Sequence, residues 1–285
     1  RSQRIEPEPD EYDHDGLNGY YFYVDDIVAF SKSVQEEVQN VRIRMDFNTV
    51  FPEFITNGLR ILGDPWQSDS GEEKYGRSVL FPDGYLDGVT FTNCQFTWRR
   101  PVAMYNIYMW DEFALKGQYD FTFRLPPVPF DGEWQIRLGF TSQQSRGVAQ
   151  IYVDNVPQGI PLDMTKVLSS EEYLGGDRYL NYDNYMKLTD EEKAEYQKAL
   201  KNKGAYDDGR SQWIGQKDHP LGNADGMYRR IVCQTYIDAT KYHYVRFRVA
   251  SDGKGNDNEF MFDFWEMVPK SVYAVDGEDA MEDDL

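Results

Sequence analysis

The segment that decides the fold reads Tyr119-Asp120-Phe121-Thr122-Phe123-Arg124, and a second run of the same kind follows at Trp134-Gln135-Ile136-Arg137-Leu138-Gly139-Phe140. Apolar and polar residues alternate in both runs, and a period of two places the apolar side chains on one face of a β-strand. The connection 126–132 holds three prolines, an aspartate and a glycine, which are typical turn residues. The two runs therefore predict neighbouring antiparallel strands with one buried and one solvated face.

The same alternation continues on both sides of this pair. It places apolar residues at Val41, Ile43, Met45 and Phe47, at Val245, Phe247 and Val249, and at Phe260, Phe262 and Phe264. Clusters of glycine, asparagine and aspartate separate such runs, as at 251–258. Short alternating strands divided by turns of this kind predict a mainly β protein, built as an antiparallel β-sandwich.

One segment follows a helical pattern instead. Thr189 and Glu192 form a capping box, acidic residues fill the first turn, lysines fill the last turn, and Gly204 ends the helix. We expect residues 168–227 to form a helical and looped insertion within a sandwich that spans 38–275. Residues 1–37 are expected to be an acidic lead-in with a terminal strand, and the acidic tail 276–285 is expected to be disordered.

The charge of the chain limits its partners. The 285 residues include 49 acidic and 30 basic ones, which gives a net charge of −19. A nucleic-acid partner is excluded, because phosphate binding needs a basic surface. No run of 18 apolar residues exists in the sequence, so no membrane span is expected, and any lipid anchor is expected upstream of Arg1. Glycans, peptides, metal ions and other proteins remain as partners, although the acidity could also serve solubility alone.

Two cysteines, Cys94 and Cys233, lie in apolar, strand-like surroundings. Such residues are usually small buried hydrophobes, and a disulfide between them is the less favoured alternative, because it requires a close approach of the two Cα atoms. With three histidines and no Cys-x-x-Cys pair, a zinc site is not expected.

The sequence contains none of the common catalytic motifs. Gly-x-Ser-x-Gly, His-Glu-x-x-His and the phosphate-binding Gly-x-x-x-x-Gly-Lys-Ser/Thr are all missing. Among 49 acidic residues, pairs suitable for a glycosidase must occur by chance. We therefore expect that the chain is not an enzyme and that it needs no cofactor.

Calcium is considered and not favoured. The loop near residue 255 offers oxygen ligands at Asp252, Asn256, Asp257 and Glu259, and calcium binds six to eight oxygen atoms. Lys254 occupies the place where an EF-hand loop has its second ligand. A solvated hairpin loop is the preferred interpretation.

A ligand site is expected in the long insertion, where an aromatic platform lies close to polar groups. The candidates are Trp213, Tyr206, Asp208 and Arg210. Sugars bind to flat aromatic rings together with a few fixed polar groups. The alternative, which we consider the better one for Trp213, is that this side chain is buried and fixes the insertion to the sandwich.

Three segments resemble known families. Residues 12–28, with Asn18-Gly19 leading to an apolar strand that ends in Val24-Asp25, resemble the closing strand of a fasciclin domain. The run from Phe262 to Tyr273 is similar to the last strand and exit of a β-sandwich that follows fasciclin domains in surface lipoproteins of Gram-negative gut bacteria. Residues 147–154 are similar to core strands of galactose-binding-like sandwiches. These likenesses imply a galactose-binding-like or jelly-roll-like sandwich.

The resemblance also implies a function. It points to a non-catalytic lipoprotein module on the outward-facing side of the outer membrane, accessory to the capture and import of glycans or peptides. Its partners would be an outer-membrane importer or other surface lipoproteins. A structural or adhesive docking module is the alternative, and an unrecognised glycan hydrolase is the third. Residues 20–30 would need partner strands, and we expect them to pair with the sandwich or with another chain.

Overall fold

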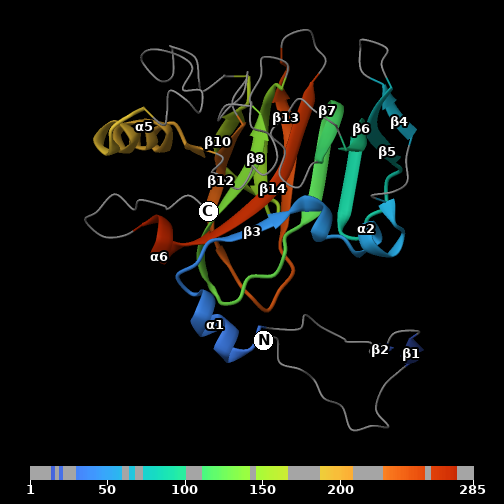
Figure 1. The fold of residues 1–285 in the computed structure, drawn as a ribbon, viewed down its shortest axis with the longest axis horizontal. Helices are drawn as coiled ribbons and strands as arrows, with labels where there is room; N and C mark the ends of the chain where they lie inside the picture. The colour runs from blue at the N-terminus through green and yellow to red at the C-terminus, as the bar shows by residue number, and fades with distance from the viewer. Residues whose placement is uncertain are drawn as a thin grey trace.

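The computed structural model describes residues 14–16, 19–21, 30–59, 64–67, 73–100, 111–141, 146–165, 187–207, 227–253 and 258–274. Within these residues the chain is mainly antiparallel β, as predicted, and twelve strands form one curled sheet. Figure 1 shows this sheet as the body of the molecule, with short helices around it. The sandwich architecture predicted from the alternating runs is consistent with this fold.

The strands of the curled sheet are β3 (Ile43–Asp46), β4 (Asp64–Gln67), β5 (Glu73–Phe81), β6 (Val89–Arg100), β7 (Glu112–Arg124), β8 (Gly132–Thr141), β9 (Val148–Val153), β10 (Val156–Asp163), β11 (Ala205–Asp207), β12 (Met227–Ile237), β13 (Tyr244–Ser251) and β14 (Glu259–Pro269). Their main path runs β10-β9-β13-β7-β14-β8-β12-β11. Strand β3 pairs with β14, and β6, β5 and β4 continue outward from β7. All of these pairings are antiparallel.

Aromatic side chains fill the space inside the curl. Phe123 on β7 lies with its ring centre 4.4 Å from that of Trp265 on β14, and Phe47 lies 5.5 Å from Phe123. Phe47 belongs to a short 3-10 helix, η1 (Phe47–Thr49), directly after β3. Buried aromatic groups of this size contribute most of the apolar area that the fold removes from water. The core therefore joins one layer, made of β6, β7, β13, β9 and β10, to a second layer made of β3, β14, β8 and β12.

The predicted alternation holds for most strands and fails in β14. The pairing of β14 with β8 shifts register between Phe262 and Trp265. Phe260 and Phe262 lie in the core as expected, but Trp265 takes the next core position. Phe264 is buried outside this core cluster, under the guanidinium of Arg44 at 4.4 Å. A β-bulge adds one residue to a strand and so exchanges its two faces.

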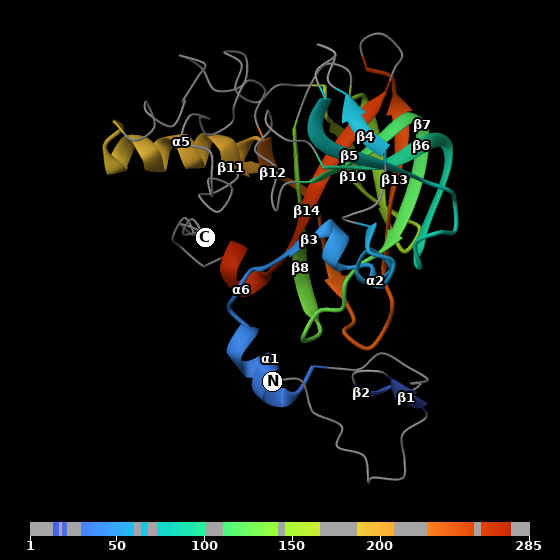
Figure 2. The ribbon, with the colours of Figure 1, turned by 45° about the vertical axis from the view of Figure 1, so that its right-hand side comes forward.

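The insertion contains the predicted helix and an additional strand. Helix α5 (Asp190–Asn202) has the capping box of Thr189 and Glu192, which is confirmed. Strand β11 then joins the sheet by pairing with β12, which the sequence did not predict. Figures 1 and 2 both place α5 on the β12 side of the sheet, away from β6 and β7.

The remaining elements are short. They are α1 (Lys32–Val38), α2 (Pro52–Thr56), α6 (Lys270–Tyr273) and a two-stranded sheet of β1 (His14–Gly16) and β2 (Gly19–Tyr21). Strand β2 pairs with β1, and no described residue of it pairs with the curled sheet. Residues 22–29 lie outside the described part of the chain, so the expected pairing of the whole segment 20–30 stays a prediction.

Candidate functional site

Strands β7 and β3 both pair with β14, one after the other along its length. Residues 259–262 of β14 pair with the beginning of β7, and residues 264–267 pair with β3. Asp263 lies between the two pairings, Asp111 directly precedes β7, and Asp46 is the last residue of β3. The bulge that reverses the faces of β14 therefore also places Asp263 beside the ends of two other strands.

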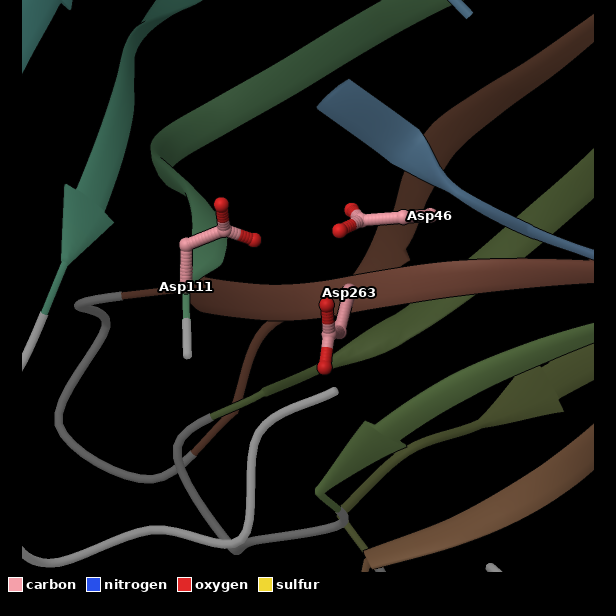
Figure 3. A group of neighbouring side chains, drawn as sticks. All are labelled: Asp46, Asp111 and Asp263. Atoms are coloured by element: carbon pink, nitrogen blue, oxygen red, sulfur yellow. The ribbon is translucent and has the colours of Figure 1, made fainter. Parts of the chain in front are cut away.

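The three aspartates form a compact buried cluster. One carboxylate oxygen from each residue lies within 4.8 Å of those from the other two, and each side chain is buried. Figure 3 shows the carboxylates of Asp46 and Asp111 turned toward each other, with Asp263 on β14 beside them. Asn48 links two members: its side-chain amide donates to Asp111, and its backbone N–H donates to Oδ1 of Asp46 at 3.2 Å.

Carboxylate oxygens are the ligands that calcium, magnesium and manganese prefer. Burying several like charges is costly unless a cation or a proton compensates them. Asp46, Asp111 and Asp263 thus have the chemistry of a candidate centre for a hard divalent cation. The cluster could not be predicted from the sequence, because 65 and 152 residues separate its successive members and no local motif connects them.

A fourth carboxyl group next to the cluster has an unusual environment. Burial raises the pKa of Glu112 to about 7, although the guanidiniums of Arg99 and Arg146 act in the opposite direction. Arg99 lies 3.9 Å from Glu112 and 3.1 Å from Glu259. A carboxyl group that titrates near neutral pH can exchange protons with a ligand.

The first layer of the sandwich has an outer surface that we call the open face. It consists of the outward side chains of β6, β7, β13 and β9: Thr90, Thr92, Asp120, Thr122, Arg124, Tyr244, Arg246, Arg248, Gln150 and Tyr152. All of these side chains are exposed or half-buried. The strand register aligns them in rows, as in Thr122–Arg246–Tyr152. The face therefore combines aromatic rings with hydrogen-bonding groups on a regular scaffold.

Ion pairs organise the open face. Arg246 donates two hydrogen bonds to Asp120, from Nε at 2.6 Å and from Nη2 at 2.5 Å. The same guanidinium lies 5.3 Å from the ring centre of Tyr152. Arg124 pairs with Asp87 at 2.9 Å. These contacts hold long side chains in fixed positions, which lowers the entropy cost of binding a ligand there.

Two tyrosines stand at one end of the open face. Tyr242 is 54% exposed and Tyr244 is 38% exposed. His243 between them is turned away, with Nδ1 2.6 Å from Oδ2 of Asp154. The guanidinium of Arg124 lies 4.9 Å from the ring centre of Tyr242. The backbone therefore presents two aromatic rings to solvent beside a cation.

The second layer carries a contrasting set of groups, which we call the covered face. Glu266 on β14 is fully buried, and Arg44 approaches it at 2.7 Å. Arg42, Arg137 and Arg229 lie at 3.5, 3.6 and 3.5 Å from the same carboxylate. Burial alone would raise the pKa of Glu266, but the four guanidiniums outweigh it and lower the pKa to about 2.

The predicted ligand residues in the insertion have different positions. Tyr206 is only 5% exposed, and the guanidinium of Arg137 lies 3.8 Å from the centre of its ring. Tyr206 thus belongs to the covered face, where its ring stacks on buried cations. Trp213, Asp208 and Arg210 lie outside the described residues, so their part in binding stays a prediction.

The candidate calcium residues do not share one centre where they are described. Asp252 accepts hydrogen bonds from Gln118 at 2.6 Å and from Asn258 at 2.8 Å, and these bonds lower its pKa. Glu259 pairs with Arg99. Asn256 and Asp257 lie outside the described residues. Calcium binding at this loop therefore stays an untested prediction, less favoured than a solvated hairpin loop.

Both cysteines are free. Cys94 is half-buried in β6, Cys233 is buried in β12, and no disulfide joins them. Burial raises the pKa of each thiol to about 12, which keeps both thiols protonated. The interpretation of the two residues as small apolar side chains agrees with this structure, and the alternative of a disulfide does not.

Comparisons with known proteins identify no family. No family model matches the chain, and no curated protein matches it. One solved structure that matches is the catalytic domain of a GH87 α-1,3-glucanase, a D1068A variant in complex with tetrasaccharides. The identity is 10% and the TM-score is 0.31, over 68% of this chain and 28% of that one. No helix in the described part of the chain is long and apolar enough to span a membrane.

This comparison corrects one expectation. From the sequence we expected that the chain is not an enzyme, whereas the matched structure is a catalytic domain. That expectation is contradicted and is not maintained. A likeness at this TM-score transfers no active site and no substrate to the present chain.

Proposed function

We propose that this chain is a glycan-binding module at a cell surface and that the open face is its binding site. The observation that carries the proposal is the combination of exposed aromatic rings and ordered ion pairs on the open face. Exposed tyrosine rings at Tyr242 and Tyr244 stand beside the ordered pairs Arg246–Asp120 and Arg124–Asp87. A sugar has apolar C–H faces that stack on aromatic rings and hydroxyl groups that need donors and acceptors.

The open face suits this role better than the covered face does. Its side chains are accessible, whereas Glu266 and Arg137 are fully buried. Most of its groups lie on paired strands, with Tyr242 just before β13 and Asp87 just before β6, and rigid strands hold a binding site more precisely than loops do. The insertion residues Trp213, Asp208 and Arg210 remain candidates for a second part of the site.

The proposed location rests on the resemblance of residues 12–28 and 262–273 to surface lipoproteins with fasciclin domains. On this basis the module would face outward from a bacterial outer membrane, held by a lipid anchor upstream of Arg1. It would deliver glycan or peptide to an outer-membrane importer or to neighbouring surface lipoproteins. A docking module that binds only other proteins is the alternative, and it would co-purify with a membrane complex without binding any polysaccharide.

Affinity electrophoresis in gels that contain soluble polysaccharides tests the proposal. The parent chain is expected to be retarded by at least one polysaccharide, and the double variant Tyr242→Ala/Tyr244→Ala is expected to lose at least tenfold in affinity. The matched control is Tyr236→Ala on β12, since Tyr236 is also an exposed tyrosine, at 61%. It should bind as the parent does. All three chains should melt at similar temperatures, because exposed rings contribute little to stability.

Two results would overturn the proposal. One is a parent chain that none of the polysaccharides retards. The other is an equal loss of affinity in the Tyr236→Ala control, which would place the site elsewhere. An assay for newly formed reducing ends on the same samples shows whether the bound polysaccharide is also cleaved.

A further inference from the structure

Two of the three arginines on the open face are paired with carboxylates at close range. Arg246 is paired with Asp120, Arg124 is paired with Asp87, and Asp154 contacts His243. Arg248 is exposed, and no carboxylate lies within 4.0 Å of it in the described part of the chain. The face therefore presents donors and acceptors side by side, and Arg248 is the one arginine among its described residues beyond these pairs, which is far less than the basic surface that binds a charged polymer. At longer range, the net charge of −19 repels polyanions.

The shape of the face favours a chain over a single sugar. Strand register aligns Thr90, Thr122, Arg246, Tyr152 and Pro157 in one row across β6, β7, β13, β9 and β10. Neighbouring strands lie about 4.8 Å apart, so this row is roughly 19 Å long. Thr90 is exposed at one end, and Val156 is 59% exposed beside the other. The row thus has no wall among the described residues that would stop a polymer.

From the two paired arginines and the open row we infer that the ligand is an uncharged glycan chain that lies across the strands and is bound along its length. This inference rests on the proposed function and adds the class and orientation of the ligand. An uncharged chain leaves the pairs Arg246–Asp120 and Arg124–Asp87 intact. An acidic chain would meet one unpaired guanidinium, at Arg248, but along the row it would have to displace the carboxylate of Asp120 or leave it facing a like charge, and both cost free energy.

The hydroxyl groups of a sugar can use an intact pair of this kind. Each hydroxyl donates one hydrogen bond and accepts others. In Arg246 and Asp120, guanidinium N–H groups and carboxylate oxygens lie next to each other, so adjacent hydroxyls could engage both. Tyr152 on the same row and Tyr244 on the next row supply aromatic surface for the apolar side of the rings.

Two binding series test the class and the orientation. The first compares dextran, starch, xylan and mannan with polygalacturonate and alginate in affinity gels. The second titrates oligosaccharides of increasing length from a neutral polysaccharide that binds. We expect retardation only by neutral polymers. We also expect an affinity that rises over the first several sugar units and then levels off, because the row has a finite length.

A charge variant locates the end of the row. Thr90→Glu adds an unmatched carboxylate at one end and should weaken the binding of long oligosaccharides at least fivefold, while the shortest binding oligosaccharide is affected less. Ser33→Glu on α1 is the control, since it adds the same charge at an exposed position outside the face. It should bind as the parent does.

The outcomes separate this inference from the proposed function. If acidic polymers bind and the double tyrosine variant abolishes their binding, the open face is the site but the inferred class is wrong. If a neutral sugar binds with an affinity that does not depend on chain length, the inferred orientation is wrong. If no polysaccharide binds at all, the proposed function itself fails.

Discussion

The two outer faces of the sandwich use the same groups for different purposes. On the covered face, Glu266 is surrounded by four guanidiniums with no exposed surface of its own. On the open face, Arg246 and Asp120 pair equally closely, but their side chains are 31% and 25% exposed. Water weakens an exposed pair and leaves it available to a ligand, whereas burial makes the pair a condition of stability. The environment of a pair therefore decides what it does.

Removing the charge of Glu266 should lower the free energy of unfolding more than any other change proposed here. Glu266→Gln leaves Arg44, Arg137 and Arg229 around a neutral side chain, and breaking a buried charge network in this way costs about 3–5 kcal/mol. We expect a large fall in the free energy of unfolding, measured by urea denaturation. A loss below about 1 kcal/mol would show that the guanidiniums have sufficient compensation elsewhere, and that the contrast between the faces is weaker than described.

The stability of the chain should fall in acid for the same reason. The pKa of Glu266 is lowered to about 2, from an ordinary value of 4.5. A lowered pKa contributes stability that is complete above pH 4.5 and is lost as the pH falls toward 2. A shift of this size corresponds to about 3 kcal/mol. Unfolding free energies measured between pH 5 and 2 should decrease in the parent, and less steeply in Glu266→Gln.

The substitution Gly139→Ala, which adds a methyl group on the covered face, should lower the stability of the fold. A Cβ at Gly139 would lie 2.2 Å from a ring carbon of Phe264, which is too close for any packing without movement. Overpacking of this kind costs about 1–3 kcal/mol. Gly132→Ala on the same strand is the matched control, because its nearest neighbour would lie at 3.8 Å. Thermal melts should separate the two variants, and equal melting temperatures would contradict the close packing.

Breaking the exposed pair should have the smallest effect on stability. Asp120→Asn removes the charge that faces Arg246, and exposed pairs contribute about 0–1 kcal/mol. The melting temperature should change little, while retardation by a neutral polysaccharide should decrease. A destabilisation as large as that of Glu266→Gln would mean that the two faces do not differ in the way proposed here.

Local patterns predicted much of this architecture. The alternation at Tyr119, Phe121 and Phe123 placed these side chains in the core correctly, because the period of two follows directly from strand geometry. The capping box of Thr189 was equally local and is present.

Long-range placement was not predictable in the same way. The bulge near Asp263 breaks the alternation, so Phe264 was assigned to the wrong side and the aspartate cluster was missed. For the open face, the alternation predicted only that the polar residues of each strand point away from the core. Its rows depend on strand order, for example β13 between β7 and β9, and strand order is fixed by contacts between distant parts of the chain.

The edge strand β10 has a consequence for how copies of this protein would share a polymer. Pro157 and Pro161 lack an N–H group, and the pairing of β10 with β9 is irregular between Gln158 and Leu162. A strand of this kind is a poor template for another strand. The row of the open face ends at the same edge. Several copies could then line up along one glycan, edge beside edge, without fusing their sheets into an aggregate.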